Sequence, residues 1–267
     1  MLTASNPALG VCIMSILAEE SPHVRPLVAW RALRTLLRNG EDTKQVFIIG
    51  EALRGRSGMR CFERFRRTEV GRSVLAGERS LLSVLGDRAA LAALPQATLG
   101  HRYHDFMAEE NLSADGLIDA FNAAGTSPLS DPLRRFRERS RDQHDLQHVV
   151  TGYGRDGLGE ICLLAFAYAQ TGNRGLGAIA LAGTFKVARA LRGQPVFTAV
   201  VQAYRHGRAA AVLIEQDWEA LLSQPLRNVR RNLGIEEPTL YRRILKGVGR
   251  DKAAAQDTRP DALAAEF

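Results

Sequence analysis

The chain of 267 residues has few aromatic side chains (6%), three cysteines and no apolar run long enough to cross a bilayer. Cys12, Cys61 and Cys162 are far apart and form no C-x-x-C pair, which argues against a disulfide framework or a structural zinc site. The apolar stretch Leu9–Ala18 is too short to span a membrane, and no basic residue precedes it as in a signal peptide. We therefore expect a cytoplasmic protein without a membrane-spanning segment.

Lysine is also scarce, although the chain is basic overall. The net charge is +7 and the isoelectric point is near 9.8, values that suggest a nucleic acid or an anionic membrane as partner. Nearly all of the 36 basic residues are arginine, however, and alanine, glycine and leucine are abundant, so much of the charge reflects compositional bias. No nucleic-acid recognition module is recognisable, and we predict no nucleic-acid partner.

Alternation of β-branched residues is nearly absent, whereas apolar residues recur at helical spacing. The expected helices are one that ends at Asn39-Gly40, one from Ser130-Asp131-Pro132 to about Val150 with a stop at Thr151-Gly152, one over Leu158–Gln170 and one over Gly175–Leu191. No internal repeat or long linker interrupts them. The sequence thus predicts a single all-α domain over residues 1–250 and a flexible C-terminal tail over residues 251–267.

The stretch Arg141–Glu160 contains the residues that point to chemistry. His144 and His148 are separated by four positions and share one face of a helix, and Asp145 lies at the edge of that face. Glu160 follows His148 after eleven intervening residues, across a glycine-rich turn, where a tight αα-hairpin returns it toward the same point. Two imidazoles and two carboxylates suit zinc, iron, manganese or cobalt. On spacing alone, a ligand set and ordinary surface side chains are equally plausible.

H-D-x-x-H followed after eleven residues by Glu resembles the signature of the Coq-four family of ubiquinone (coenzyme Q) biosynthesis proteins. Further segments between about residues 95 and 237 are similar to that family: Thr98-Leu99-Gly100 with Tyr103, Asp105, Phe106 and Met107; Leu158-Gly159-Glu160 with Gln170-Thr171-Gly172; and Trp218-Glu219 with Pro225-Leu226, Arg230 and Leu233-Gly234-Ile235. The N-terminal third is less distinctive.

The resemblance implies an all-α protein that binds a polyprenyl lipid and rests peripherally on the inner face of a membrane. It implies that His144, Asp145, His148 and Glu160 hold a divalent metal and act in catalysis. The implied activity replaces the C1 carboxylate of a polyprenylated 4-hydroxybenzoate-type ring by hydroxyl. The alternative is a non-catalytic, lipid-binding scaffold that organises the other ubiquinone biosynthesis enzymes. We also expect a homo-oligomer, and an anionic membrane surface among the partners.

Several neighbouring features allow a second interpretation. Gly152–Gly157 matches G-x-G-x-x-G, but a helix precedes it, so we interpret it as a turn and not as a dinucleotide site. The arginine-rich segment Arg54–Arg72, with interleaved Phe62 and Phe65, suggests either a surface that lies on anionic lipid or a solvated face. The Gly/Ala-rich helix Gly175–Ala190 leaves room for an isoprenoid chain or simply packs closely.

Three further hypotheses concern charged residues. An HD-type phosphohydrolase would need His101 or His104 as an additional ligand and would leave His148 and Glu160 unexplained. Asp142 and Asp156 are candidates to orient the ligand imidazoles, although charges at helix ends or in loops are favoured. Arg137 and Arg141 precede His144 on its stripe, where we favour a solvated face over contact with an anionic substrate.

Overall fold

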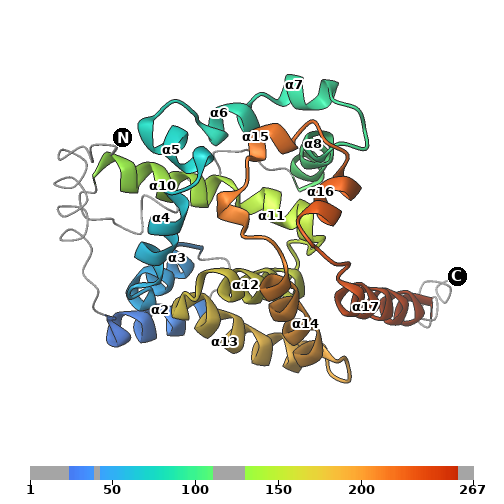
Figure 1. Ribbon diagram of the computed structural model, residues 1–267. Coiled ribbons are helices and arrows are strands. Elements are labelled where there is room, and N and C mark those ends of the chain that lie inside the picture. Colours follow the sequence, from blue (N-terminus) through green and yellow to red (C-terminus); the bar gives the residue numbers. More distant parts are fainter. Residues whose placement is uncertain (1–23, 39–42, 111–129, 258–267) are drawn as a thin grey trace, which may run out of the picture.

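A computed structural model describes residues 24–38, 43–110 and 130–257 of the chain (Figure 1). Within these ranges no strand forms, and β-type pairing is limited to one isolated bridge between Thr98 and Pro225. The predicted all-α fold is therefore confirmed. The helices are α2 (Pro26–Arg38), α3 (Thr43–Leu53), α4 (Ser57–Phe65), α5 (Glu69–Ala76), α6 (Leu81–Gly86), α7 (Arg88–Ala93), α8 (Leu99–Glu109), α10 (Asp131–Asp142), α11 (His144–Thr151), α12 (Gly157–Thr171), α13 (Arg174–Ala190), α14 (Val196–Ala209), η1 (Leu213–Glu215, a 3-10 turn), α15 (Trp218–Leu221), α16 (Leu226–Asn232) and α17 (Thr239–Asp257).

The boundaries of several helices follow from their end signals, and one does not. Pro132 lies in the first turn of α10, and Gly152 ends α11 in the left-handed conformation with φ of 76°. The single helix that we predicted between them is interrupted at Gln143, where α10 ends and α11 begins. Gln143 is buried, and its side-chain oxygen accepts a hydrogen bond from the indole of Trp218 at 2.9 Å. At the other end of the chain, α17 continues past residue 250, where we placed the start of the tail, to Asp257; residues 258–267 lie outside the described ranges.

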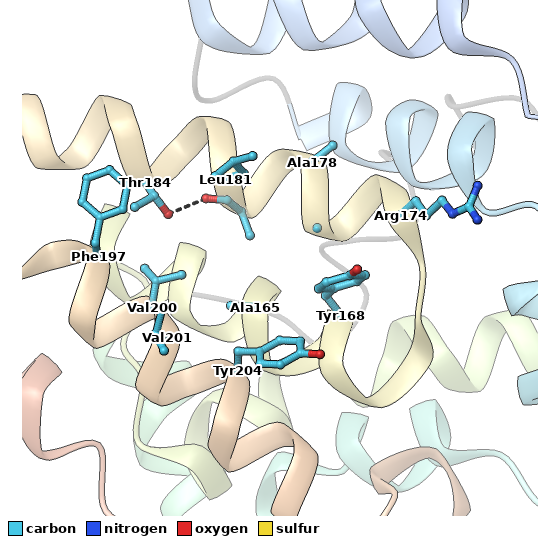
Figure 2. Close-up of a pocket in the computed structure, with 12 residues that line it drawn as sticks. Ala165, Tyr168, Arg174, Ala178, Leu181, Thr184, Phe197, Val200, Val201 and Tyr204 are labelled. Atoms are coloured by element: carbon cyan, nitrogen blue, oxygen red, sulfur yellow. Dashed lines mark hydrogen bonds between the residues drawn. The ribbon is translucent and has the colours of Figure 1, made fainter.

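Helices α12, α13 and α14 pack against one another in the lower half of Figure 1 and leave an apolar groove of about 460 Å³, whose lining is drawn in Figure 2. Tyr168 of α12, Leu181 of α13 and the rings of Phe197 and Tyr204 from α14 line it, with Arg174 as its charged residue. Leu181 is 59% exposed, so the rim of the groove presents apolar surface to solvent. The small residues of α13 serve both expected uses: Gly177 lines the groove, whereas a Cβ on Gly175 or Gly183 would lie only 2.6 or 2.5 Å from atoms of a neighbouring helix, so these two glycines allow close packing.

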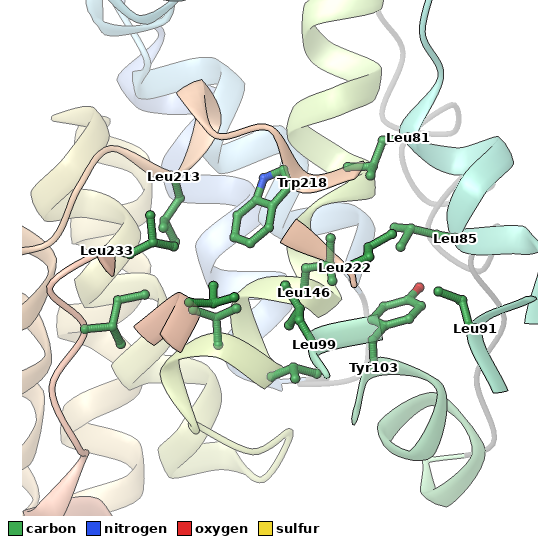
Figure 3. Packing of buried hydrophobic residues seen from close by; sticks show 14 of the residues in the cluster. Leu81, Leu85, Leu91, Leu99, Tyr103, Leu146, Leu213, Trp218, Leu222 and Leu233 are labelled. Carbon is green, nitrogen blue, oxygen red and sulfur yellow. The ribbon is translucent and has the colours of Figure 1, made fainter. Parts of the chain in front are cut away.

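The largest hydrophobic core joins α8, α11 and the short helices α6, α7, α15 and α16 (Figure 3). Trp218 lies in this core fully buried, and Leu146 of α11 packs there with Leu99 and Tyr103 of α8. Helix α11 contacts this core through Leu146 and contacts the α11–α12 turn through His148, so packing on both sides fixes its orientation. A second core of α12, α13, α14 and α17 holds Tyr153 of that turn and Ile161 of α12.

The arginine-rich segments are more buried than the sequence indicated. The side chain of Arg137 is 10% exposed and pairs with Glu51, and that of Arg141 is 7% exposed and pairs with Asp142. The predicted solvated face at these two arginines is therefore wrong, because both charges are neutralised inside the protein. Arg139 is also buried and forms a bidentate pair with Glu219, both distances being 2.8 Å.

The aromatic residues of the segment Arg54–Arg72 are also buried. Phe62 and Phe65 are buried and pack against Phe136 of α10, with ring centroids 5.6 and 5.5 Å apart. These rings cannot enter a lipid surface without unfolding α4, so they do not form the apolar side of a membrane contact. No helix of the described ranges combines the length and the apolar character that crossing a bilayer requires.

Candidate metal centre

Helix α11, the turn that follows it and the first turn of α12 build the centre. Gly152 reverses the chain after α11, and Asp156 then caps α12 by accepting hydrogen bonds from Leu158 N and Gly159 N at 3.0 and 3.1 Å. This hairpin places Glu160, in the first turn of α12, opposite His148. The geometry matches the return across the turn that the sequence predicts.

Three of the four predicted ligands form one tight group. The ligand atoms of His144, Asp145 and His148 lie within 4.8 Å of one another, and His144 Nδ1 is 3.0 Å from Asp145 Oδ1. Glu160 stands beside this group, because its Oε1 is 3.6 Å from His148 Nε2. His148 is fully enclosed, whereas the side chains of His144 and Glu160 are 36% and 35% exposed. The centre is thus walled on one side and open to solvent on the other.

The orientation of His148 is set by its neighbours. Its Nδ1–H donates a hydrogen bond to the Tyr153 carbonyl oxygen at 2.9 Å, and this bond leaves the lone pair of Nε2 directed toward Glu160. Nε2 is buried and has no hydrogen-bond partner among the described residues. The ring of Phe106 stacks on the imidazole, with centroids 5.8 Å apart and planes inclined by 20°. A buried acceptor without a donor is costly, and a metal ion would satisfy it.

Close backbone contact holds the two helices in this arrangement. A Cβ atom on Gly159 would lie 2.0 Å from the Gly154 carbonyl oxygen, so only glycine lets α12 start this close to the turn. Tyr241 of α17 accepts a hydrogen bond from Gly154 N at 2.9 Å and also bonds to Asp156. Asp156 is therefore occupied as a helix cap, and Asp142 pairs with Arg141, so neither of these carboxylates orients a ligand imidazole through a hydrogen bond.

The glycines of Gly152–Gly157 serve the turn and not a nucleotide. Gly152 supplies the left-handed residue, and Gly154 leaves space for Tyr241, whose hydroxyl a Cβ would approach to 2.7 Å. His101 and His104 both point to Asp105 on their own helix, at 3.5 Å each, and do not belong to the group around His148. The pattern of an HD-type phosphohydrolase is therefore not completed by these histidines.

The surroundings of the centre shift the pKa values of its two imidazoles in opposite directions. Burial, together with the charge of His144, lowers the pKa of His148 to about 4, so this ring is neutral and ready to bind a metal. Burial opposes charge on His144 too, but its hydrogen bond to Asp145 and the carboxylate charges raise its pKa. Burial raises the pKa of Glu160. Burial acts in the same direction on Asp145, but the hydrogen bond to His144 and the charge of that ring outweigh it, so the pKa of Asp145 is lowered. A divalent cation would take the place of the protons that these side chains bind.

Two residues beside the centre were not identified from the sequence as part of the site. Phe106 forms one wall, and nothing in the spacing of α8 relates it to α11. Arg155 lies within the glycine-rich turn, where its Nε is 3.8 Å from Glu160 Oε1. Its position between His148 and Glu160 in the chain was a usable signal, since a tight hairpin must carry its turn residues close to the ligands.

Comparison with known proteins identifies the family. The family model described as "Coenzyme Q (ubiquinone) biosynthesis protein Coq4" matches residues 21–239. The chain belongs to the Coq4 family. A ubiquinone biosynthesis protein, COQ4, mitochondrial, from Clavispora lusitaniae is 28% identical over 209 residues, which cover 77% of this chain and 63% of the relative. The COQ4 homolog, mitochondrial, from Danio rerio is 30% identical over 210 residues, covering 76% and 73%.

A crystal structure of a protein from Nostoc punctiforme has the same fold as this Coq4-family chain. The TM-score is 0.57 at 22% identity, and the alignment covers 80% of this chain and 100% of that one. The family model over residues 21–239 confirms the family to which the H-D-x-x-H and Glu pattern pointed. All four residues of that pattern occur in this chain, and the structure brings three of them into one group with Glu160 beside it.

Proposed function

We propose that this Coq4-family protein is a metal-dependent enzyme that replaces the C1 carboxylate of a polyprenylated 4-hydroxybenzoate-type ring by hydroxyl. The observation that carries the proposal is the buried, unpartnered Nε2 of His148, directed at Glu160 in a centre that opens to solvent. A centre that only stabilised the hairpin would need no open side. A centre that binds a substrate needs one, because the substrate must reach positions that the protein leaves free.

The residues present fit a divalent metal ion. His148 would bind through Nε2, and Asp145, His144 and Glu160 supply one further nitrogen and two carboxylates, a donor set for iron, manganese, cobalt or zinc. When bound, such an ion supplies Lewis-acid stabilisation of negative charge and, if redox-active, electron transfer. The Tyr153 carbonyl keeps His148 in the required tautomer, as second partners of ligand histidines commonly do.

The proposed reaction breaks the bond between C1 and the carboxylate carbon and forms a bond between C1 and oxygen. Carbon dioxide leaves, and the ring is oxidised by two electrons. Molecular oxygen is the oxidant: one atom becomes the new hydroxyl, and the other becomes water with two protons and two electrons from an external reductant. The ring lies at the open side of the centre, beside the exposed edges of His144 and Glu160.

The groove between α13 and α14 is the proposed site of the polyprenyl tail. Glu160 and the groove residues Ala165 and Tyr168 belong to the same helix, α12. At 1.5 Å and about 100° per residue they lie only about 8 and 12 Å further along its axis but about 140° and 80° around it, so a tail attached to a ring at the centre would pass around α12 to enter the groove. Apart from Arg174, the lining side chains described above are apolar or aromatic, as an isoprenoid requires.

The same face is the proposed contact with an anionic membrane. Residues 161–214, which include α13 and α14, contain no aspartate or glutamate. Six basic residues occur in this stretch, and all are exposed: Arg174, Lys186, Arg189, Arg192, Arg205 and Arg208. Phe185 is 61% exposed and packs edge-to-face on Phe197, so α13 and α14 expose apolar rings as well as basic side chains. This surface replaces Arg54–Arg72 as the proposed lipid contact.

Activity of the purified full chain tests the enzyme proposal. Protein loaded separately with Fe²⁺, Mn²⁺, Co²⁺ or Zn²⁺ is incubated with 3-geranyl-4-hydroxybenzoate, ascorbate and ¹⁸O-labelled oxygen, and products are identified by mass spectrometry. We expect a decarboxylated product that carries one labelled hydroxyl, and its loss in Glu160→Gln. Glu236→Gln, which changes a largely exposed carboxylate (73% exposed), is the matched control. If no metal yields product although prenylated lipid binds, the non-catalytic scaffold is the better description.

Vesicle binding tests the membrane proposal. We expect the protein to sediment with vesicles that contain anionic phospholipid, and Phe185→Asp to weaken this binding. Val84→Asp is the control, because Val84 is also exposed (38%) but lies on α6, outside the α13–α14 face. Equal binding of both variants would refute the assignment of this face.

A further inference from the structure

Arg155 is the positively charged side chain beside Glu160 at the metal centre. It lies in the turn between α11 and α12, and its Nε is 3.8 Å from Glu160 Oε1, the same oxygen that is 3.6 Å from His148 Nε2. One carboxylate oxygen therefore separates the guanidinium from the imidazole. The side chain of Arg155 is 32% exposed, much like that of Glu160, so both face the open side of the centre.

Within the described residues, Arg155 has an ion-pair contact with Glu160, but its Nε donates no hydrogen bond. Its Nε is buried and has no hydrogen-bond partner among the described residues, and the distance to Glu160 exceeds that of a hydrogen bond. Other arginines near the centre are held differently: Arg141 pairs with Asp142, and Arg230 donates to the carbonyl oxygens that end α11. A guanidinium with free donors beside an open site is suited to an exogenous anion.

The charges of the loaded centre are compatible with an anionic ligand. Two neutral imidazoles and the carboxylates of Asp145 and Glu160 balance a divalent cation, and the guanidinium of Arg155 adds one positive charge. Asp142 is paired with Arg141. Asp156 is hydrogen-bonded only to a neutral hydroxyl and to backbone N–H groups, which do not neutralise a carboxylate, and its charge reaches Glu160. The position of the guanidinium at the open side, and not a net charge of the site, therefore indicates where an anion binds.

We propose that Arg155 binds the carboxylate of the aromatic acid at the open side of the metal centre and thereby selects acids over neutral rings of the same shape. The inference rests on the proposed function and adds a substrate-recognition residue to it. The fork of the guanidinium accepts a carboxylate in two parallel hydrogen bonds, which also orient the ring. After the carboxylate leaves as carbon dioxide, the neutral product loses this contact and dissociates more readily.

Binding to the Zn²⁺-loaded full chain tests the inference without turnover, because zinc has no redox chemistry. The affinities of 3-geranyl-4-hydroxybenzoate and of 3-geranyl-4-hydroxybenzyl alcohol are measured by titration calorimetry, and zinc content is measured by mass spectrometry. Arg155→Gln is expected to weaken binding of the acid by about 10- to 100-fold, the range for a hydrogen bond to a charged group, and to leave the alcohol unchanged. Arg155→Lys should fall between, since it keeps the charge without the fork.

Arg134→Gln is the matched control, because Arg134 lies on α10 and pairs with Asp131 and Glu138 away from the centre. The inference is overturned if Arg155→Gln weakens the acid and the alcohol equally, or lowers zinc content, since Arg155 would then only position Glu160. It is also overturned if Arg155→Gln binds the acid like wild type; the proposed function then stands. If wild type itself does not prefer the acid, the inference and the acid substrate both fail.

Discussion

Replacing Gly159 by alanine is expected to separate Glu160 from His148. The new Cβ would lie 2.0 Å from the Gly154 carbonyl oxygen and 2.7 Å from its carbonyl carbon. Nonbonded heavy atoms attract at roughly 3.5 Å, so the turn and the start of α12 must move apart by more than about 1 Å. Both contacts are with backbone, which cannot rotate away as a flexible side chain can.

The magnitude follows from what this movement disrupts. Overpacking costs about 1–3 kcal/mol, and the shift strains the Asp156 cap, a contact worth about 1 kcal/mol. We expect Gly159→Ala to lower the free energy of unfolding by about 2–4 kcal/mol and to weaken zinc binding. Urea unfolding followed by circular dichroism measures the first effect. Competition with a chelator measures the second.

Gly157→Ala is the control two residues away in the same helix. Its Cβ would meet Val187 at 3.6 Å, an ordinary contact, so the change should be neutral or stabilising by up to about 1 kcal/mol. The reasoning is refuted if Gly159→Ala unfolds at the same urea concentration as wild type. It is also refuted if the two variants lose equal stability, because the loss would then reflect alanine in this turn and not the approach of Gly154.

Three further predictions concern His148, the turn after α11 and a buried ion pair. The metal-free protein should lose about 3 kcal/mol of unfolding free energy between pH 7 and pH 4, because the pKa of His148 is about 4 in the folded protein and 6.5 ordinarily, so the unfolded chain binds the proton more readily. His148→Gln should not show this loss, and urea titrations at each pH measure it. Gly152→Ala should cost about 1–2 kcal/mol by calorimetry, since φ is 76°, and an unchanged melting temperature would contradict this. Arg139→Met should cost about 3 kcal/mol, the lower end for breaking a buried ion pair, because Glu219 keeps only the longer contact with Arg79 at 3.5 Å. Adding Glu219→Gln should restore part of this loss in the same assay.

Local chemistry explains why much of the fold was predictable. The end signals at Pro132 and Gly152 act within one turn of their own helix, and apolar spacing defines α12 and α13 to within a residue or two. The interruption at Gln143 was not predictable, because no proline or glycine marks it. Its side chain bonds to Trp218, which is far away in the sequence.

The residues that meet at the centre could be predicted from their spacing. His144, Asp145 and His148 share a helix, so their separation along the chain brings them together, and a glycine-rich turn returns Glu160. Their surroundings could not be predicted in this way: Phe106 against His148, buried and paired arginines where a solvated face was expected, and an apolar groove on one side of α12. Spacing acts over a few residues of one helix, whereas burial and pairing depend on helices that are distant in the chain and pack only when the whole domain forms.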